Sequence, residues 1–192
     1  MRRGAFVLAG VLMLAGGPLH PDGTMAQMLV HPNWVLSHAL MTCGFAALVV
    51  GTLLLSPGVT WTAGARRWRQ LALAGAVLQT IEMVFHTVSY VDANNLAAGQ
   101  STPVLSTHLA LSVVCYPAFG ATWIGFIIVT ARERLFGPSW FAWLGVAGAL
   151  AHGLSAPLVV GLGVEGARIL FPLLMLFALW LILGAVWPAR RS

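Results

Sequence analysis

The chain has 192 residues, of which 59% are hydrophobic and only 8% are charged, and its formal net charge is +5. Because soluble globular domains carry about 25% charged residues, this composition indicates an integral membrane protein with the lipid bilayer as its main partner. All ten basic residues are arginine, which excludes a lysine Schiff base, a pyridoxal enzyme and a lysine-containing phosphate loop. The arginines flank apolar runs instead of forming a patch, so no nucleic-acid partner is expected.

The first element covers residues 1–19, in which two arginines precede an apolar stretch. This stretch is either a signal-like segment or a first spanning helix of marginal length, because about 20 residues are usually needed to cross a bilayer. A cleavage-like sequence at residues 15–17 is followed unfavourably by Pro18. We therefore expect an uncleaved first helix, and then an outer segment at residues 20–32.

Hydropathy predicts five further spans, at residues 33–56, 70–92, 104–130, 139–163 and 166–187. The whole chain, residues 1–192, is thus expected to be a single transmembrane domain of the all-α class, with six transmembrane helices, or five if the first is cleaved. The connections are short, so consecutive helices should be antiparallel neighbours. Nine of the ten arginines fall on one side of this arrangement and only Arg168 on the other. This positive-inside pattern predicts a multi-pass protein of the cell membrane with both termini cytoplasmic.

Polar side chains at helical spacing mark the faces that should turn inward. The first and last spans carry no strongly polar side chain, whereas the four spans between them each carry a polar stripe. These stripes begin at His38, Gln79, His108 and His152. Helices two to five are therefore predicted to form an antiparallel four-helix bundle, with the first and sixth helices packed outside it and facing lipid.

Ionisable residues within membrane spans are costly and usually functional. His38, His86 and His108 each lie a short way inside the outer end of their helix, at a depth of roughly 6–9 Å for a rise of about 1.5 Å per residue. Glu82 and His152 lie about one helical turn deeper, and Glu82 shares a helix face with His86. We expect two layers of polar groups that open toward the outer side, with Glu82 facing His152.

The leading hypothesis from this pattern is a b-type cytochrome-like membrane redox protein that functions in electron transfer. Two of His38, His86 and His108 would hold the iron of haem b, since opposed histidines in a bundle can ligate haem. Arg168 would meet the haem propionates, although it could equally pair with Glu165 or Asp92.

Two alternatives remain open. In the first, a membrane enzyme acts on a lipid or isoprenoid, either by acid/base chemistry at Glu82 and His86 or with zinc, copper or non-haem iron. The metal ligands would then be drawn from His38, His86, His108, His152 and Glu82. In the second, the chain is an accessory or metal-binding subunit of a larger membrane redox complex, with a quinone or lipid as a possible substrate. Its outer segment offers donors that suit copper: His20, Asp22, Met25, Met28 and His31.

A purely structural role, in which the histidines hydrogen-bond and hold helices together, also fits the pattern.

Overall fold

The computed structural model describes residues 3–55 and 61–187, and within these residues it contains helices and no strands. Three residues of the arginine pattern, Arg2, Arg190 and Arg191, lie outside the described residues. Gly4–Leu19 is a shorter apolar helix. Five helices are long and apolar enough to cross a membrane: Asn33–Leu54, Ala63–Ala97, Pro103–Arg132, Ser139–Gly161 and Glu165–Val186.

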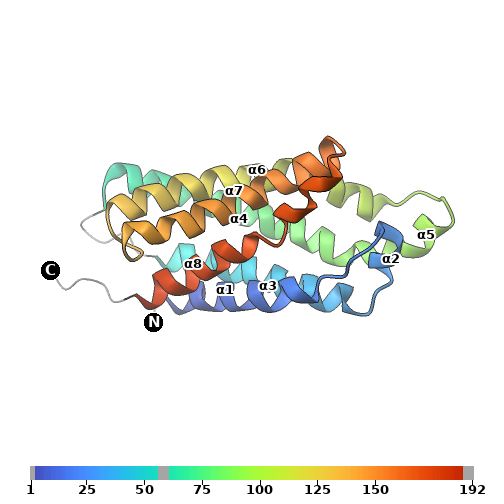
Figure 1. Cartoon of the computed structure of the whole chain (residues 1–192), viewed down its shortest axis with the longest axis horizontal. Helices are drawn as coiled ribbons and strands as arrows, with labels where there is room; N and C mark the ends of the chain where they lie inside the picture. The colour runs from blue at the N-terminus through green and yellow to red at the C-terminus, as the bar shows by residue number, and fades with distance from the viewer. Residues whose placement is uncertain (1–2, 56–60, 188–192) are drawn as a thin grey trace.

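The α-helices follow one another with short connections (Figure 1). Short 3-10 or π turns precede or follow several of them, at Gly17–Leu19, Ser89–Asp92, Ser139–Phe141, Pro157–Gly161 and Glu165–Leu170. The α-helices are α1 (Gly4–Gly16), α2 (Met25–Leu29), α3 (Asn33–Leu54), α4 (Ala63–Val88), α5 (Ala93–Ala97), α6 (Pro103–Arg132), α7 (Ala142–Ala156) and α8 (Leu174–Val186).

Helix α4 begins earlier than the hydropathy boundary at residue 70. Its start is fixed by Thr62, whose side-chain oxygen accepts the backbone N–H of Ala65 at 3.1 Å. A threonine in this position satisfies one of the backbone donors that a helix leaves unpaired at its first turn. The arginines that follow are good helix formers, so the charged segment before residue 70 is part of the helix.

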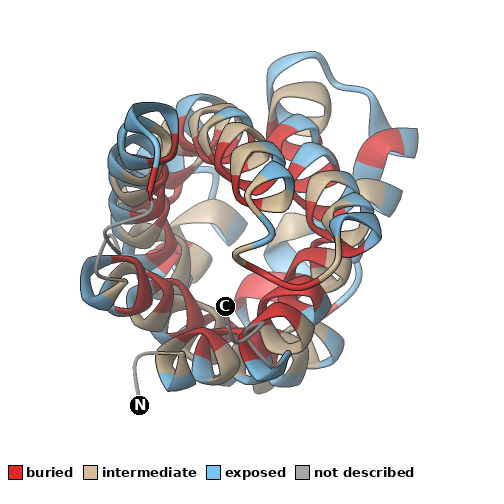
Figure 2. Ribbon diagram, turned by 90° about the vertical axis from the view of Figure 1, so that its left-hand side faces the viewer, coloured by how far each residue is buried: buried red, intermediate tan, exposed pale blue. Residues whose placement is uncertain are grey.

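The six longer helices form a closed ring, which Figure 2 shows end-on. Around the ring the order is α1, α3, α4, α6, α7 and α8, and α8 packs against α1. The expected four-helix bundle is therefore corrected, because α1 and α8 lie between α3 and α7 and close the ring. Glycine permits these contacts: a Cβ atom at Gly10 would lie 2.6 Å from the carbonyl oxygen of Ala178, and one at Gly44 would lie 3.1 Å from that of Ala9.

Large apolar side chains fill the interior of the ring, and α1 and α8 contribute to them. Phe6 and Phe177 are completely buried, and Trp180 is nearly so. They belong to one core cluster with Phe45 and Trp123. The first and last helices thus pack part of their surface into the protein and do not face outward all round.

The two ends of the ring differ. At one end, named here the arginine end, the Arg3 guanidinium donates to the carbonyl oxygens of Trp187 and Leu135 at 3.0 and 3.2 Å. The opposite end, named the histidine end, is covered by α2 and α5 (Figure 1). There a small second cluster joins α2 to the ring: Met28 and Leu29 of α2 pack with Trp34 and Leu105.

Candidate functional site

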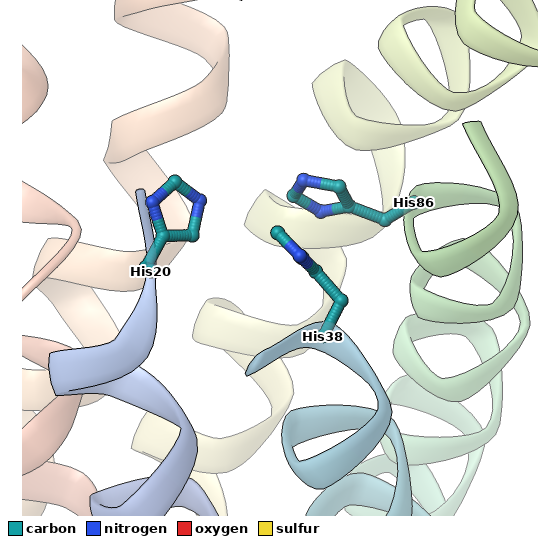
Figure 3. A group of neighbouring side chains, drawn as sticks. All are labelled: His20, His38 and His86. Carbon is teal, nitrogen blue, oxygen red and sulfur yellow. The ribbon is translucent and has the colours of Figure 1, made fainter. Parts of the chain in front are cut away.

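Three imidazoles meet at the histidine end, each from a different segment. His20 follows the turn after α1, His38 lies on α3 and His86 lies on α4, and their rings converge (Figure 3). One possible ligand atom from each of the three lies within 4.8 Å of the others. The ring centroids of His20 and His38 are 4.8 Å apart, and those of His38 and His86 are 4.1 Å apart. We call these three residues the histidine triad.

Hydrogen bonds orient two members of the triad. The Nδ1 atom of His38 lies 2.6 Å from the carbonyl oxygen of Trp34, and the Nδ1 atom of His20 lies 2.9 Å from that of Pro21. A carbonyl oxygen can only accept, so Nδ1 carries the proton and Nε2 keeps its lone pair. The Nε2 atom of His38 is buried and has no hydrogen-bond partner among the described residues. Metal-binding histidines have this pattern, in which one nitrogen is anchored and the other is left for the ion.

The third member, His86, connects the triad to a second group. Its ring stacks on that of His108, with centroids 3.9 Å apart and an interplanar angle of 25°. Its Nδ1 atom is buried without a partner among the described residues and lies 4.0 Å from Oε1 of Glu82. One ligand atom from each of Glu82, His86 and His108 also lies within 4.8 Å of the other two.

The carboxylate of Glu82 is fully buried, and both of its oxygens already have partners. Oε1 lies 2.6 Å from Nδ1 of His108, and Oε2 accepts the side-chain amide of Gln79 at 2.8 Å. Burying a charge is costly unless it is paired and hydrogen-bonded. Glu82 and His108 thus satisfy each other within the second group, whereas His38 and His86 of the histidine triad each keep a buried nitrogen without a partner among the described residues.

A threonine pair aligns the two helices that carry His38 and His86. The hydroxyl oxygens of Thr42 on α3 and Thr87 on α4 lie 2.8 Å apart. The Thr42 hydroxyl is also within hydrogen-bonding distance of the carbonyl oxygens of His38 and Met83, at 2.7 and 3.2 Å. These bonds set the height of one helix against the other, and so bring both imidazoles to one level.

A cavity of about 460 Å³ opens beside these groups. His20, His86, His108 and His152 line it, together with segments of all the ring helices. Every methionine that the structure describes also lines it: Met13, Met25, Met28, Met41, Met83 and Met175. The site therefore combines imidazole nitrogens with a wall that is rich in thioethers.

The structure brings together four of the residues that the sequence singled out, namely His38, His86, His108 and Glu82, and separates two others. The ring of His152 stacks on Tyr116 with centroids 4.1 Å apart, and no hydrogen bond or ion pair joins it to Glu82 among the described residues. Arg168 also lines the cavity, but its Nε atom lies 2.5 Å from the carboxylate of Glu165. Both charged side chains are more than half exposed, so this ion pair is at the surface.

Sequence reasoning missed the part that His20 takes in this site. It placed the residue in an outer-segment copper group with His31, but His31 is exposed and its Nδ1 atom accepts the backbone N–H of Asn33. The signal for His20 is its position just after Pro18, because a proline in the first turn of a 3-10 helix directs the chain out of α1 and back over the ring end. The sequence placed Gln79 in a polar stripe, but did not predict that its side-chain amide donates to the carboxylate of Glu82.

The protonation state of His20 suits a ligand. Burial lowers the pKa of its ring below the ordinary value for histidine, and this effect outweighs the hydrogen bond to Pro21 and the nearby charge of Asp22, which both raise it. A neutral imidazole offers a lone pair to a cation, whereas an imidazolium does not.

In comparisons with known proteins, no family model, no curated protein and no solved structure matches the chain. Its function is therefore argued from the geometry of the site.

Proposed function

We propose that this chain is a multi-pass membrane protein that binds one metal ion at the histidine triad, His20, His38 and His86. The observation that carries the proposal is the convergence of three imidazoles within 4.8 Å, with the Nε2 atom of His38 buried and without a partner among the described residues. Metal–nitrogen bonds of about 2.0–2.1 Å bring the nitrogens of a tetrahedral site to roughly 3.3 Å from one another. Small rotations of the rings are enough to reach that spacing.

Copper, in its monovalent form, is the metal we propose. Imidazole suits zinc, copper and iron alike, but thioethers select Cu(I). The triad contains no carboxylate, and six methionines line the cavity beside it. A cation at the triad would also favour the ionised form of the buried carboxyl group of Glu82, which lies 4.0 Å from Nδ1 of His86.

Haem b suits the geometry of the three helical histidines less well. Two imidazoles bound to one haem iron lie on opposite faces of the porphyrin, with ring centroids about 6 Å apart. The ring of His86 lies 4.1 Å from that of His38 and 3.9 Å from that of His108. These two pairs leave no space for a porphyrin between their rings, so the packing of His86 against both neighbours favours a bare ion at this residue.

A membrane enzyme is the second candidate function. The buried carboxylate of Glu82 shares a short 2.6 Å hydrogen bond with His108 beside a cavity. Such a pair can move a proton to or from a bound apolar molecule. In this candidate Glu82 works with His108, while His86 belongs to the metal site.

We further propose that the histidine end faces the outside of the cell. The starts of α1 and α4 and the end of α6 lie at the arginine end (Figure 1). At or next to these helix ends are the described arginines of the predicted cytoplasmic side: Arg3, Arg66, Arg67, Arg69, Arg132 and Arg134. An excess of arginine marks the cytoplasmic side of membrane proteins. The metal site would then be reached from the outer side.

Metal analysis of the full chain, purified in a mild detergent and loaded with Cu(I), tests the metal site. We expect about one copper per chain in the wild type and in the control His31→Ala, whose ring lies outside the triad. The variants His20→Ala and His38→Ala should retain less than about a tenth of that copper. Because His20 lies in a connection, its removal leaves the helix packing intact. Equal copper in all four proteins, or none in the wild type, would overturn the proposal.

A further inference from the structure

Below the triad, the cavity has a polar floor that the metal site does not use. Tyr116 on α6 and His152 on α7 both line the cavity, and each is at most 4% exposed. Their rings stack with centroids 4.1 Å apart and an interplanar angle of 22°. Phe119 meets the ring of His152 edge-on at 5.3 Å, so the pair is held in place by aromatic neighbours.

Neither polar group of this floor has a protein partner. The Nε2 atom of His152 is buried without a hydrogen bond among the described residues. The structure likewise contains no hydrogen bond between the Tyr116 hydroxyl and another described residue. Buried polar groups without partners are unfavourable and rare in native proteins. The Nε2 atom of His152 is such a group, and the tyrosine ring stacked on it carries a hydroxyl that also has no partner among the described residues. Together, on the floor of one cavity, they indicate that a ligand completes their hydrogen bonds.

The walls of the cavity are suited to an apolar molecule. They include six methionine side chains and the aromatic side chains of Phe45 and Phe171, together with leucine, valine, alanine and proline residues. The volume of about 460 Å³ lies in the range of small-molecule sites, which is about 300–1,000 Å³. Flexible methionine side chains adapt to the outline of a bound molecule, and the aromatic rings offer flat surfaces to a flat partner.

The charges of the lining residues favour a neutral ligand over an anionic one. Among the described lining residues Arg168 is the permanent cation, and it is exposed and paired with Glu165. A carboxylate or phosphate beside Tyr116 and His152 would therefore lack a charged side chain as a partner, and burying such a group unpaired is costly. The tyrosine hydroxyl and the imidazole instead offer neutral donors, which suit a carbonyl oxygen.

We propose that the cavity binds a neutral, flat ring compound that carries a carbonyl oxygen, of the quinone class. The Tyr116 hydroxyl and a ring N–H of His152 donate to its oxygen, while methionine and phenylalanine side chains surround its ring. The inference deepens the proposed function, because it names a ligand for the cavity that the metal site adjoins. Binding of the ring itself depends on Tyr116 and His152 and not on the triad.

Quenching of tryptophan fluorescence by decylubiquinone, titrated into the purified full chain in detergent, tests this inference, since Trp34 lines the same cavity. We expect saturable quenching in the wild type. Tyr116→Phe keeps the ring and removes the hydroxyl, and His152→Phe keeps an aromatic ring and removes the nitrogens. Each should raise the Kd about 3- to 10-fold, the loss expected for one hydrogen bond.

Two matched controls and one further readout make the result decisive. The variants Tyr90→Phe and His31→Phe alter an exposed tyrosine and an exposed histidine, and should bind decylubiquinone as the wild type does. The copper content of the Tyr116→Phe and His152→Phe proteins should equal that of the wild type. Absence of saturable quenching, or an equal Kd in all variants, overturns the inference even if copper is bound. Quinone binding without copper would refute the metal site and leave the inference standing.

Discussion

His38 is anchored by its own helix: its Nδ1–H donates to the carbonyl oxygen of Trp34, one turn earlier on α3. This bond fixes the tautomer and turns Nε2 away from the helix that carries it. The carboxylate of Glu82 has a similar effect on His108, to which it is bonded at 2.6 Å. Because His108 stacks on His86, the carboxylate influences the triad through one intermediate ring.

Replacing Glu82 with glutamine is predicted to weaken metal binding without removing a ligand. Glutamine has the shape of glutamate, so the contacts with Gln79 and His108 can be kept, but the negative charge that offsets the cation is lost. Loss of such an outer-shell partner typically lowers metal affinity 10- to 100-fold. Competition with a Cu(I) chelator of known affinity measures this change.

The matched control for this prediction is Glu165→Gln, which removes an exposed carboxylate from the pair with Arg168. Its copper affinity should equal that of the wild type, because exposed ion pairs contribute little. An unchanged affinity in Glu82→Gln would mean that the buried carboxylate does not support the metal site.

At the residue scale, the sequence predicted the helical part of the site and missed the part in a loop. Glu82 and His86 are one turn apart on a helix, so their shared face follows from helix geometry. His20 could not be placed in this way, because its position depends on the path of the chain after Pro18. The stacking of His152 on Tyr116 depends on helix rotation, which apolar periodicity fixes only loosely.

At the scale of helices, α1 and α8 complete the ring through close backbone contacts. The carbonyl oxygen of Ala178 on α8 lies directly against Gly10 on α1. On the other side of α8, a Cβ atom at Gly148 of α7 would meet the backbone of Phe177. Such small residues let membrane helices pack closely, and here they join the two most apolar helices to the rest.

The substitution Gly10→Val is predicted to destabilise the protein, because the added side chain has no space between α1 and α8. Overpacking of this kind costs about 1–3 kcal/mol. Thermal unfolding followed by tryptophan fluorescence should give a lower Tm than that of the wild type.

Gly4→Val, on the same helix, provides the comparison, since nothing lies within 4 Å of a Cβ atom at Gly4. This variant should unfold at the temperature of the wild type. Equal unfolding temperatures for both variants would contradict a place for α1 in the ring.

At the element scale, hydropathy predicted the apolar helices, but it could not give their arrangement. A helix that is apolar all round can face lipid or fill a protein interior, because Phe177 and Trp180 suit either environment. The four polar stripes suggested a bundle of four helices. In the structure six helices form a wider ring, which has room for large aromatic side chains such as Phe177 and Trp180 in its core. The early start of α4 was missed because the arginines up to Arg69 lower the hydropathy of this segment. They do not interrupt the helix.

At the scale of the whole molecule, charge and chemistry lie at opposite ends. The arginine end holds the guanidinium groups, and Arg69 donates there to the carbonyl oxygens of Thr52 and Leu53 at the end of α3. The histidine end holds the triad and the cavity beneath α2 and α5. In a membrane, this polarity would hold the arginine end in the cytoplasm and open the cavity to the outside.

Labelling of single cysteines with a membrane-impermeant maleimide tests this orientation in intact cells. In a background with Cys43 and Cys115 replaced by serine, Gln100→Cys at the histidine end should react from outside. Ser139→Cys, at the arginine end, should react only after the membrane is permeabilised. Both positions are exposed, so the reverse pattern would mean that the protein is inserted the other way round.

X-ray absorption spectroscopy at the copper edge of the loaded full chain tests the metal site most directly, because it reports the ligands of the ion. We predict three imidazole nitrogens at about 2.0 Å in the wild type, and a copper signal about tenfold weaker in His20→Ala. A spectrum without imidazole scattering, or one that is identical in wild type and His20→Ala, would contradict binding at the histidine triad.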